Sequence, residues 1–146
     1  MKAMRSGRSF LFRLPKGSDI GIEVAAACRR AKVRCAWVQA IGATVKARLG
    51  YYDQRRRRYS EKEFRGEMEI LHCSGNVSFK DGVPFAHLHA ALADAKYRVW
   101  GGHLFASEVF AAEVWLQELR GPAPVRLSDP KTGLALWRLP AGRPRR

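Results

Sequence analysis

The sequence predicts an α+β domain of the two-layer α/β type, with one main α-helix against a bent, mostly antiparallel β-sheet. Apolar residues recur at helical spacing in one segment, residues 20–32, and roughly eight strand-like runs fill the rest without a regular βαβ alternation. The length of 146 residues and the 47% content of hydrophobic residues suit one domain with its own core. We therefore expect a domain at 9–120, between a flexible N-terminus at 1–8 and a tail at 121–146 that is rich in proline and arginine.

The first strand and the helix have clear boundaries in the sequence. The strand at 9–14 ends at Pro15. Ser18 and Asp19 are both suited to cap a helix, because their side chains accept hydrogen bonds from free backbone N–H groups. The helix then extends to residue 32, and the cations in its last turn complement the helix dipole.

The remaining segments alternate between apolar runs and turn signals. Asp81-Gly82 is a tight-turn signal, and residues 54–58 and 94–96 are further hairpin turns. The later strands are expected at 33–42, 44–52, 59–65, 68–79, 83–93, 97–105, 109–119 and, in the tail, 134–139.

Three histidines are candidates for sharing one metal ion. His87 and His89 are two residues apart in a predicted strand, so their rings point to the same face. A three-residue turn within 94–97 places His103 opposite one of them, unless the two glycines before His103 add a bulge. Neutral imidazoles suit zinc or another divalent transition metal, one per chain, and three of them leave a position for a further ligand. Histidines that only hydrogen-bond in a polar groove are the alternative.

Three other residues bear on this site. Glu69 and Glu113 lie in strand-like runs, and each is a candidate fourth ligand, a partner that orients an imidazole, or a member of an ion pair. His72 is interpreted as an ordinary strand histidine.

The formal net charge of +14 is the strongest feature of the composition. It would attract nucleic acid, acidic proteins or anionic membranes. A run of four arginines lies next to tyrosines and could contact phosphates and bases, although a solvated hairpin tip is the alternative. The run consists of Arg55, Arg56, Arg57 and Arg58.

The cysteines and the N-terminal segment indicate a cytoplasmic protein. Cys28, Cys35 and Cys73 are odd in number, lack CxxC spacing and lie in apolar stretches, which predicts reduced, buried thiols. The only apolar cluster near the N-terminus is Phe10-Leu11-Phe12, far short of a signal peptide or a membrane span. We therefore expect no membrane partner.

The order of short motifs resembles a bacterial PPC domain, the plant and prokaryote conserved domain. The resemblance covers roughly residues 11–119 and is carried mainly by Ser74-Gly75-Asn76-Val77, His87-Leu88-His89 and Gly101-Gly102-His103-Leu104. It implies a bent antiparallel sheet with one helix, and a homotrimer packed through sheet surfaces. It also implies a metal, usually zinc, at the positions of His87, His89 and His103.

The same resemblance suggests DNA as a partner. In plants the domain follows AT-hook segments in nuclear DNA-associated proteins, and the prokaryotic relatives are often labelled DNA-binding. The last residues of this chain contain the Gly-Arg-Pro of such a hook, with Ala141 where the hook core has arginine. Arg143, Arg145 and Arg146 are therefore candidate minor-groove contacts, and an association with the nucleoid is the corresponding expectation.

Three functions remain open at this point. The first is a trimeric, metal-stabilised module that associates with DNA through charge. The second is a metal-dependent enzyme acting on a small molecule at the open three-histidine site, with Glu69 or Glu113 as base. The third is a structural or protein-interaction trimer. The sequence has no P-loop, dinucleotide fingerprint or nucleophile–base pair.

Overall fold

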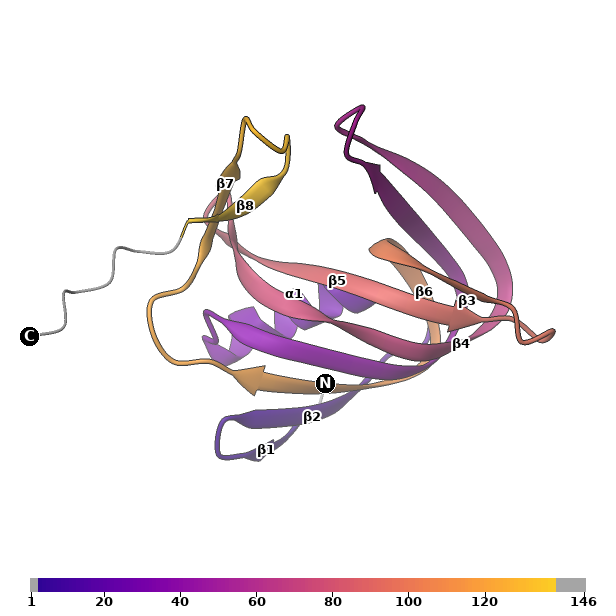
Figure 1. The fold of residues 1–146 in the computed structure, drawn as a ribbon. Coiled ribbons are helices and arrows are strands. Elements are labelled where there is room, and N and C mark those ends of the chain that lie inside the picture. The colour runs from indigo at the N-terminus through magenta and orange to yellow at the C-terminus, as the bar shows by residue number, and fades with distance from the viewer. Residues whose placement is uncertain (1–2, 139–146) are drawn as a thin grey trace, which may run out of the picture.

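The computed structural model describes residues 3–138, in which one sheet of eight strands bends around a single helix (Figure 1). Every strand pair in this part of the chain is antiparallel except β4 with β7, which confirms the mostly antiparallel sheet with one helix. The elements are β1 (Ala3–Ser6), β2 (Ser9–Leu14), α1 (Ile20–Ala31), β3 (Ala36–Asp53), β4 (Arg58–Lys80), β5 (Val83–Ala93), β6 (Val99–Glu118), β7 (Val125–Ser128) and β8 (Ala135–Arg138).

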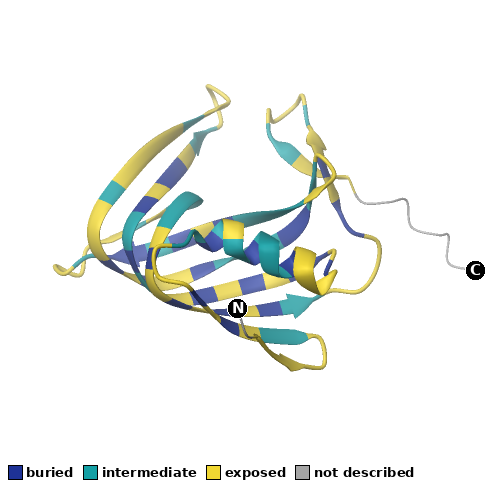
Figure 2. Cartoon of the chain, turned by 180° about the vertical axis from the view of Figure 1, so that it is seen from behind, coloured by how far each residue is buried: buried dark blue, intermediate teal, exposed yellow. Residues whose placement is uncertain are grey.

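The helix forms where the sequence predicts it. Asp19 caps its N-terminus, because the carboxylate oxygen Oδ1 accepts a hydrogen bond from the Ile22 N–H at 2.8 Å. The second oxygen of Asp19 accepts one from the Ser107 N–H on β6 at 2.7 Å, so the same carboxylate fixes the helix to the sheet. The buried residues of the helix, Ile20, Val24 and Cys28, belong to the face that packs against β5 and β6, and dark blue segments mark buried residues along α1 in Figure 2.

Three of the strands are longer than the sequence predicts. β3, β4 and β6 each join two expected strands into one continuous, bent strand. The pairing of β3 shifts register at Gly42, which has φ 140°, and a Cβ at this position would overlap the carbonyl oxygen of Ala111. The glycine therefore allows a bulge and a close backbone approach, which bends the strand without ending it.

Both ends of the described chain form additional strands. Within residues 1–8, the segment for which the sequence predicts flexibility, Ala3–Ser6 form β1 and pair along β2. Every residue of β1 is exposed, so no apolar pattern marks this strand in the sequence. In the tail, the strand expected at 134–139 is found as β8, and it pairs with β7, which the sequence analysis did not predict.

The core lies between the helix and the concave side of the sheet. All three cysteines are buried and free, as predicted, and burial raises the pKa of the Cys28 and Cys73 thiols to about 12. Within residues 3–138, no helix has the length and apolar composition needed to cross a membrane.

Two hairpins rise from the same side of the sheet, and their tips point towards each other over β5 (Figure 1). The first is the far part of β3 and β4, and the second is β7 with β8. They are joined by hydrogen bonds, since the Tyr52 hydroxyl donates to the Thr132 carbonyl oxygen at 2.6 Å and the Arg57 guanidinium donates to the Pro130 carbonyl oxygen at 3.1 Å. Both hairpins contribute residues to the wall of the cavity that His87 and His103 also line.

Candidate metal centre

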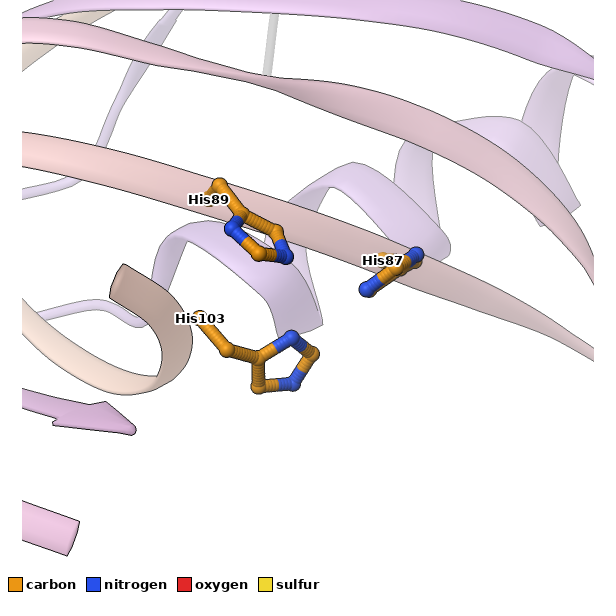
Figure 3. Close-up of side chains that lie close together, drawn as sticks. All are labelled: His87, His89 and His103. Carbon is orange, nitrogen blue, oxygen red and sulfur yellow. The ribbon is translucent and has the colours of Figure 1, made fainter. Parts of the chain in front are cut away.

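His87, His89 and His103 come together as the hairpin argument predicts. His87 and His89 alternate along β5 with the buried Leu88 and Ala90, so both rings leave the strand on the side away from the core. His103 on β6 is the direct cross-strand partner of His89. One ligand nitrogen from each ring lies within 4.8 Å of the others, and Figure 3 shows the three rings converging from the two strands.

The electrostatics of the site keep two of these rings neutral. Burial, reinforced by the nearby Arg126 charge, lowers the pKa of His87 to about 4. Burial and the neighbouring His89 lower the pKa of His103 to about 4. A neutral imidazole offers the lone pair that a metal needs.

One buried nitrogen lacks a partner. His103 Nδ1 is the only buried side-chain nitrogen or oxygen among residues 3–138 that makes no hydrogen bond. Such an unsatisfied group is costly unless something binds it. An orphaned imidazole nitrogen beside two further imidazoles fits a divalent transition metal, so the residues present suit the ion that the sequence predicts.

Arg126, on β7, is a site residue that the sequence analysis missed. Its Nη2 lies 3.0 Å from His87 Nδ1 and also donates to the Asn76 side-chain oxygen at 3.0 Å. Its Nε donates to the Ser78 hydroxyl at 2.9 Å, and its Nη1 donates to the Ala135 carbonyl oxygen at 3.0 Å. The only sequence signal is an arginine between two apolar residues in Val125-Arg126-Leu127, a weak strand pattern that does not point to the histidines.

A cavity of about 900 Å³ opens beside the histidines, bounded by the sheet, the helix N-terminus and the two hairpins. His87, His103 and Arg126 supply polar groups to its wall, and Phe85 and Phe105 supply apolar surface. Its volume suits a small molecule, and a few polar groups in a mostly apolar wall are typical of ligand sites.

Glu69 and Glu113 do not join this site. Glu69 on β4 pairs with Ala93, at the far end of β5 from His87, and Glu113 on β6 pairs with Ile41 and Arg13. Both are exposed, and the group of metal-ligating side chains that contains the three histidines includes neither of them. His72 is also exposed and lies outside the group, as its interpretation as a strand histidine predicts.

The four consecutive arginines form the tip of the β3–β4 hairpin. All four side chains are exposed, and Arg56 lies 3.8 Å from the Asp53 carboxylate. Arg57 adopts a left-handed conformation with φ 51° at the turn and contacts the β7–β8 hairpin. Arg143, Arg145 and Arg146 lie outside the described residues.

Known proteins resemble this chain over most of its length. A metal-containing protein of Archaeoglobus fulgidus is 44% identical, with a TM-score of 0.87, and the match covers 92% of this chain and 96% of that one. A plant- and prokaryote-conserved (PPC) protein of Pyrococcus horikoshii is 36% identical, with a TM-score of 0.85 and coverage of 93% and 98%. A protein of Ralstonia eutropha JMP134 named as a candidate DNA-binding protein is 25% identical, with a TM-score of 0.86 and coverage of 95% and 96%.

A curated relative is much longer than this chain. The bifunctional protein GlmU of Synechococcus sp. (strain JA-3-3Ab) is 35% identical over 130 residues, which are 86% of this chain and 20% of GlmU. The chain thus spans about a fifth of the length of the curated relatives it matches. The model of the Plants and Prokaryotes Conserved (PCC) domain matches residues 1–120, and the chain therefore belongs to this family, as its motifs predict.

Proposed function

We propose that this chain is a metal-binding PPC module that holds one divalent transition metal per chain, with zinc as the first candidate. His87, His89 and His103 are the ligands. The observation that carries the proposal is the convergence of three ring nitrogens within 4.8 Å, where His103 Nδ1 has no partner of its own. The metal-containing relative from Archaeoglobus fulgidus supports it.

The three histidines determine what this site does chemically. As neutral rings, they donate lone pairs without adding negative charge, so a bound dication keeps its full charge for attracting anions and polarising a ligand. Three protein ligands leave zinc a further coordination position. A metal-dependent enzyme could use this open coordination position. However, Glu69 and Glu113, the two candidate bases, lie elsewhere on the sheet.

Metal analysis by mass spectrometry tests the proposal, on protein purified without a histidine tag and dialysed against zinc. We expect about one zinc per chain in the wild type and almost none in the double variant His87→Ala/His89→Ala. His72→Ala is the matched control, because it removes an exposed histidine from the neighbouring strand β4 and should keep the full metal content. A wild-type protein that retains no metal after dialysis refutes the metal centre.

Self-association as a homotrimer is the second part of the proposal. The side of the sheet away from the helix exposes large apolar residues, including Trp115, which is 38% exposed, and Trp37, which is 43% exposed. Leu11, directly across from Trp115 on β2, is 44% exposed and extends the same apolar surface. Contiguous apolar surface of this kind is typical of protein interfaces.

Light scattering during gel filtration measures the assembly directly. A trimer would have three times the 16.5 kDa mass of one chain. Trp115→Glu should reduce the mass towards that of one chain, whereas Arg29→Gln, at an exposed position on the helix at the other side of the sheet, should leave it unchanged. A wild-type mass of one chain would exclude self-association.

Charge-driven association with DNA is a second candidate function. The net charge of +14, the exposed arginine tip at 55–58 and the Ralstonia eutropha relative favour it. Binding through phosphates predicts an affinity that falls steeply with salt and depends little on base sequence. Such a protein would associate with the bacterial nucleoid.

Fluorescence anisotropy with two duplexes of unrelated sequence tests this candidate at several salt concentrations. The triple variant Arg55→Ser/Arg56→Ser/Arg58→Ser should bind more weakly and lower the salt slope, and Arg57 is kept because it joins the two hairpins. If chelation lowers the melting temperature but every binding measurement stays unchanged, the metal only stabilises the fold and the structural-trimer alternative holds.

A further inference from the structure

Arg126 carries a positive charge that no carboxylate of the described residues balances. The residue is only 9% exposed, and none of the ion pairs within residues 3–138 includes it. Its four hydrogen-bond acceptors, on Asn76, Ser78, His87 and Ala135, are all neutral. Buried charges in proteins are normally paired, and the rings of Phe85 and Trp137, each 5.6 Å from the guanidinium carbon, supply only part of that stabilisation.

The hydrogen bond from Arg126 to His87 is incompatible with a metal on His87. A neutral imidazole has one lone pair and one N–H, and arginine can only donate. In the structure, the lone pair on Nδ1 faces Arg126 Nη2 at 3.0 Å, so the proton is on Nε2. If either nitrogen binds a metal, the other must carry the proton and can no longer accept from Arg126.

Metal binding therefore leaves donor groups on Arg126 without acceptors. A guanidinium has five N–H groups. The contacts to Ser78, Ala135 and Asn76 use one hydrogen each from Nε, Nη1 and Nη2. One hydrogen on each terminal nitrogen then remains for another acceptor, and a carboxylate is the strongest acceptor for a guanidinium.

The cavity next to Arg126 has room and chemistry for such a ligand. Arg126, His87 and His103 line the same space of about 900 Å³, and Phe85, Phe105 and Leu136 contribute apolar wall. Two carboxylates also line it. Asp19 already accepts from Ile22 and Ser107, and Asp81 is exposed at the β4–β5 turn beside the cation Lys80.

We propose that Arg126, together with the metal held by the three histidines, binds the carboxylate of a small molecule with an apolar body. The proposal rests on the proposed metal centre, which supplies the second positive group of the subsite. Arg126 is a binding residue here, and its hydrogen bond to His87 belongs to the protein without ligand. If the site belongs to an enzyme, this assignment predicts that its substrates are small carboxylates.

The test is a ¹⁹F NMR titration of the full-length chain with 4-fluorobenzoate, with and without zinc. The neutral analogue 4-fluorobenzamide has the same shape without the charge, and inorganic phosphate serves as a competing anion. Arg126→Met removes the guanidinium, and Arg126→Lys keeps the charge but loses the paired donors. Arg138→Met is the matched control, since it removes an arginine from the same β7–β8 hairpin at an exposed position outside the cavity wall.

We expect zinc-loaded wild type and Arg138→Met to bind 4-fluorobenzoate, with little binding of the benzamide. Arg126→Met should bind about tenfold more weakly or worse, the size expected for loss of a charge-assisted hydrogen bond. If that variant does not fold, weakened binding by a folded Arg126→Lys supports the same conclusion. A zinc-loaded Arg126→Met that binds as tightly as wild type overturns the proposal and leaves the metal centre intact.

Two further outcomes separate the two proposals. If the protein holds no zinc, the metal centre fails, and binding of 4-fluorobenzoate that still requires Arg126 supports the anion subsite alone. If phosphate binds through Arg126 and 4-fluorobenzoate does not, the assignment of a carboxylate is wrong.

Discussion

Gly102, the residue before His103, provides a quantitative test of how the fold positions the metal centre. A Cβ added at Gly102 would lie 2.6 Å from the Gly50 carbonyl oxygen on β3, well inside van der Waals contact. Gly50 is also the β3 partner of His103. Gly102→Ala therefore forces β3 and β6 apart at the point where β6 carries His103.

The expected change in the free energy of unfolding of Gly102→Ala is the balance of two opposing effects. Overpacking of a well-packed site costs up to about 3 kcal/mol. Replacing a strand glycine by alanine stabilises the fold by about 0.5–1 kcal/mol, because glycine loses more conformational freedom on folding. We expect Gly102→Ala to lower the free energy of unfolding by about 2 kcal/mol.

The matched control is Gly101→Ala, one residue earlier on the same strand. A Cβ at Gly101 would lie 3.2 Å from the Ala90 carbonyl oxygen, a tight contact that a small shift relieves. Its free energy of unfolding should stay within about 0.5 kcal/mol of wild type.

Urea unfolding of the metal-free variants measures stability, and competition with a chromophoric chelator measures zinc affinity. Displacement of His103 should weaken zinc binding by about tenfold or more in Gly102→Ala and much less in Gly101→Ala. If the two variants are equally stable and bind zinc equally well, the close approach of β3 to β6 does not position His103 and the reasoning is wrong.

The remaining predictions concern the core, the thiols and the metal. Leu88→Ala, which removes a side chain that is 1% exposed between His87 and His89, should lower the free energy of unfolding by about 2–5 kcal/mol in urea titrations, and a change below about 1 kcal/mol would contradict its place in the core. The three buried thiols should react with a disulfide reagent at pH 8 only as fast as the protein unfolds, since burial raises the pKa of Cys28 and Cys73 to about 12. Rapid reaction of the native protein would contradict this. Zinc at about a hundredfold excess over its dissociation constant should stabilise the fold by about 2.7 kcal/mol and raise the melting temperature by about 5 °C or more. Equal melting temperatures with zinc and with chelator would argue against a bound metal.

The local sequence determined the helix and the histidine site. The Asp19 cap and the spacing of Ile20, Val24 and Cys28 depend only on neighbouring residues, and both appear in the structure as predicted. The same holds for His87 and His89, since alternation along a strand fixes their common face. A short turn between β5 and β6 then leaves little choice for His103, because hairpin register follows from loop length.

Residues far apart in the sequence were placed by tertiary structure alone. Gly42, which locally signals a strand end, instead supports a close backbone contact with Ala111, so β3 continues through it. On the continuous strand β6, Glu113 lies ten residues beyond His103 and is not among the ligating side chains that gather with it.

Arg126 shows most clearly what the sequence leaves open. Its position depends on the parallel pairing of β7 with β4, for which a single residue pair, Phe79 with Val125, defines the register. It also depends on Asn76 and Ser78, which become its neighbours only when the tail folds back across the sheet. The sequence alone thus determined the group of three histidines and the fold family, because these follow from local spacing and motif order. Tertiary structure decided which charge lies beside the histidines and which side chains line the cavity, because both arise from contacts between segments that no local pattern connects.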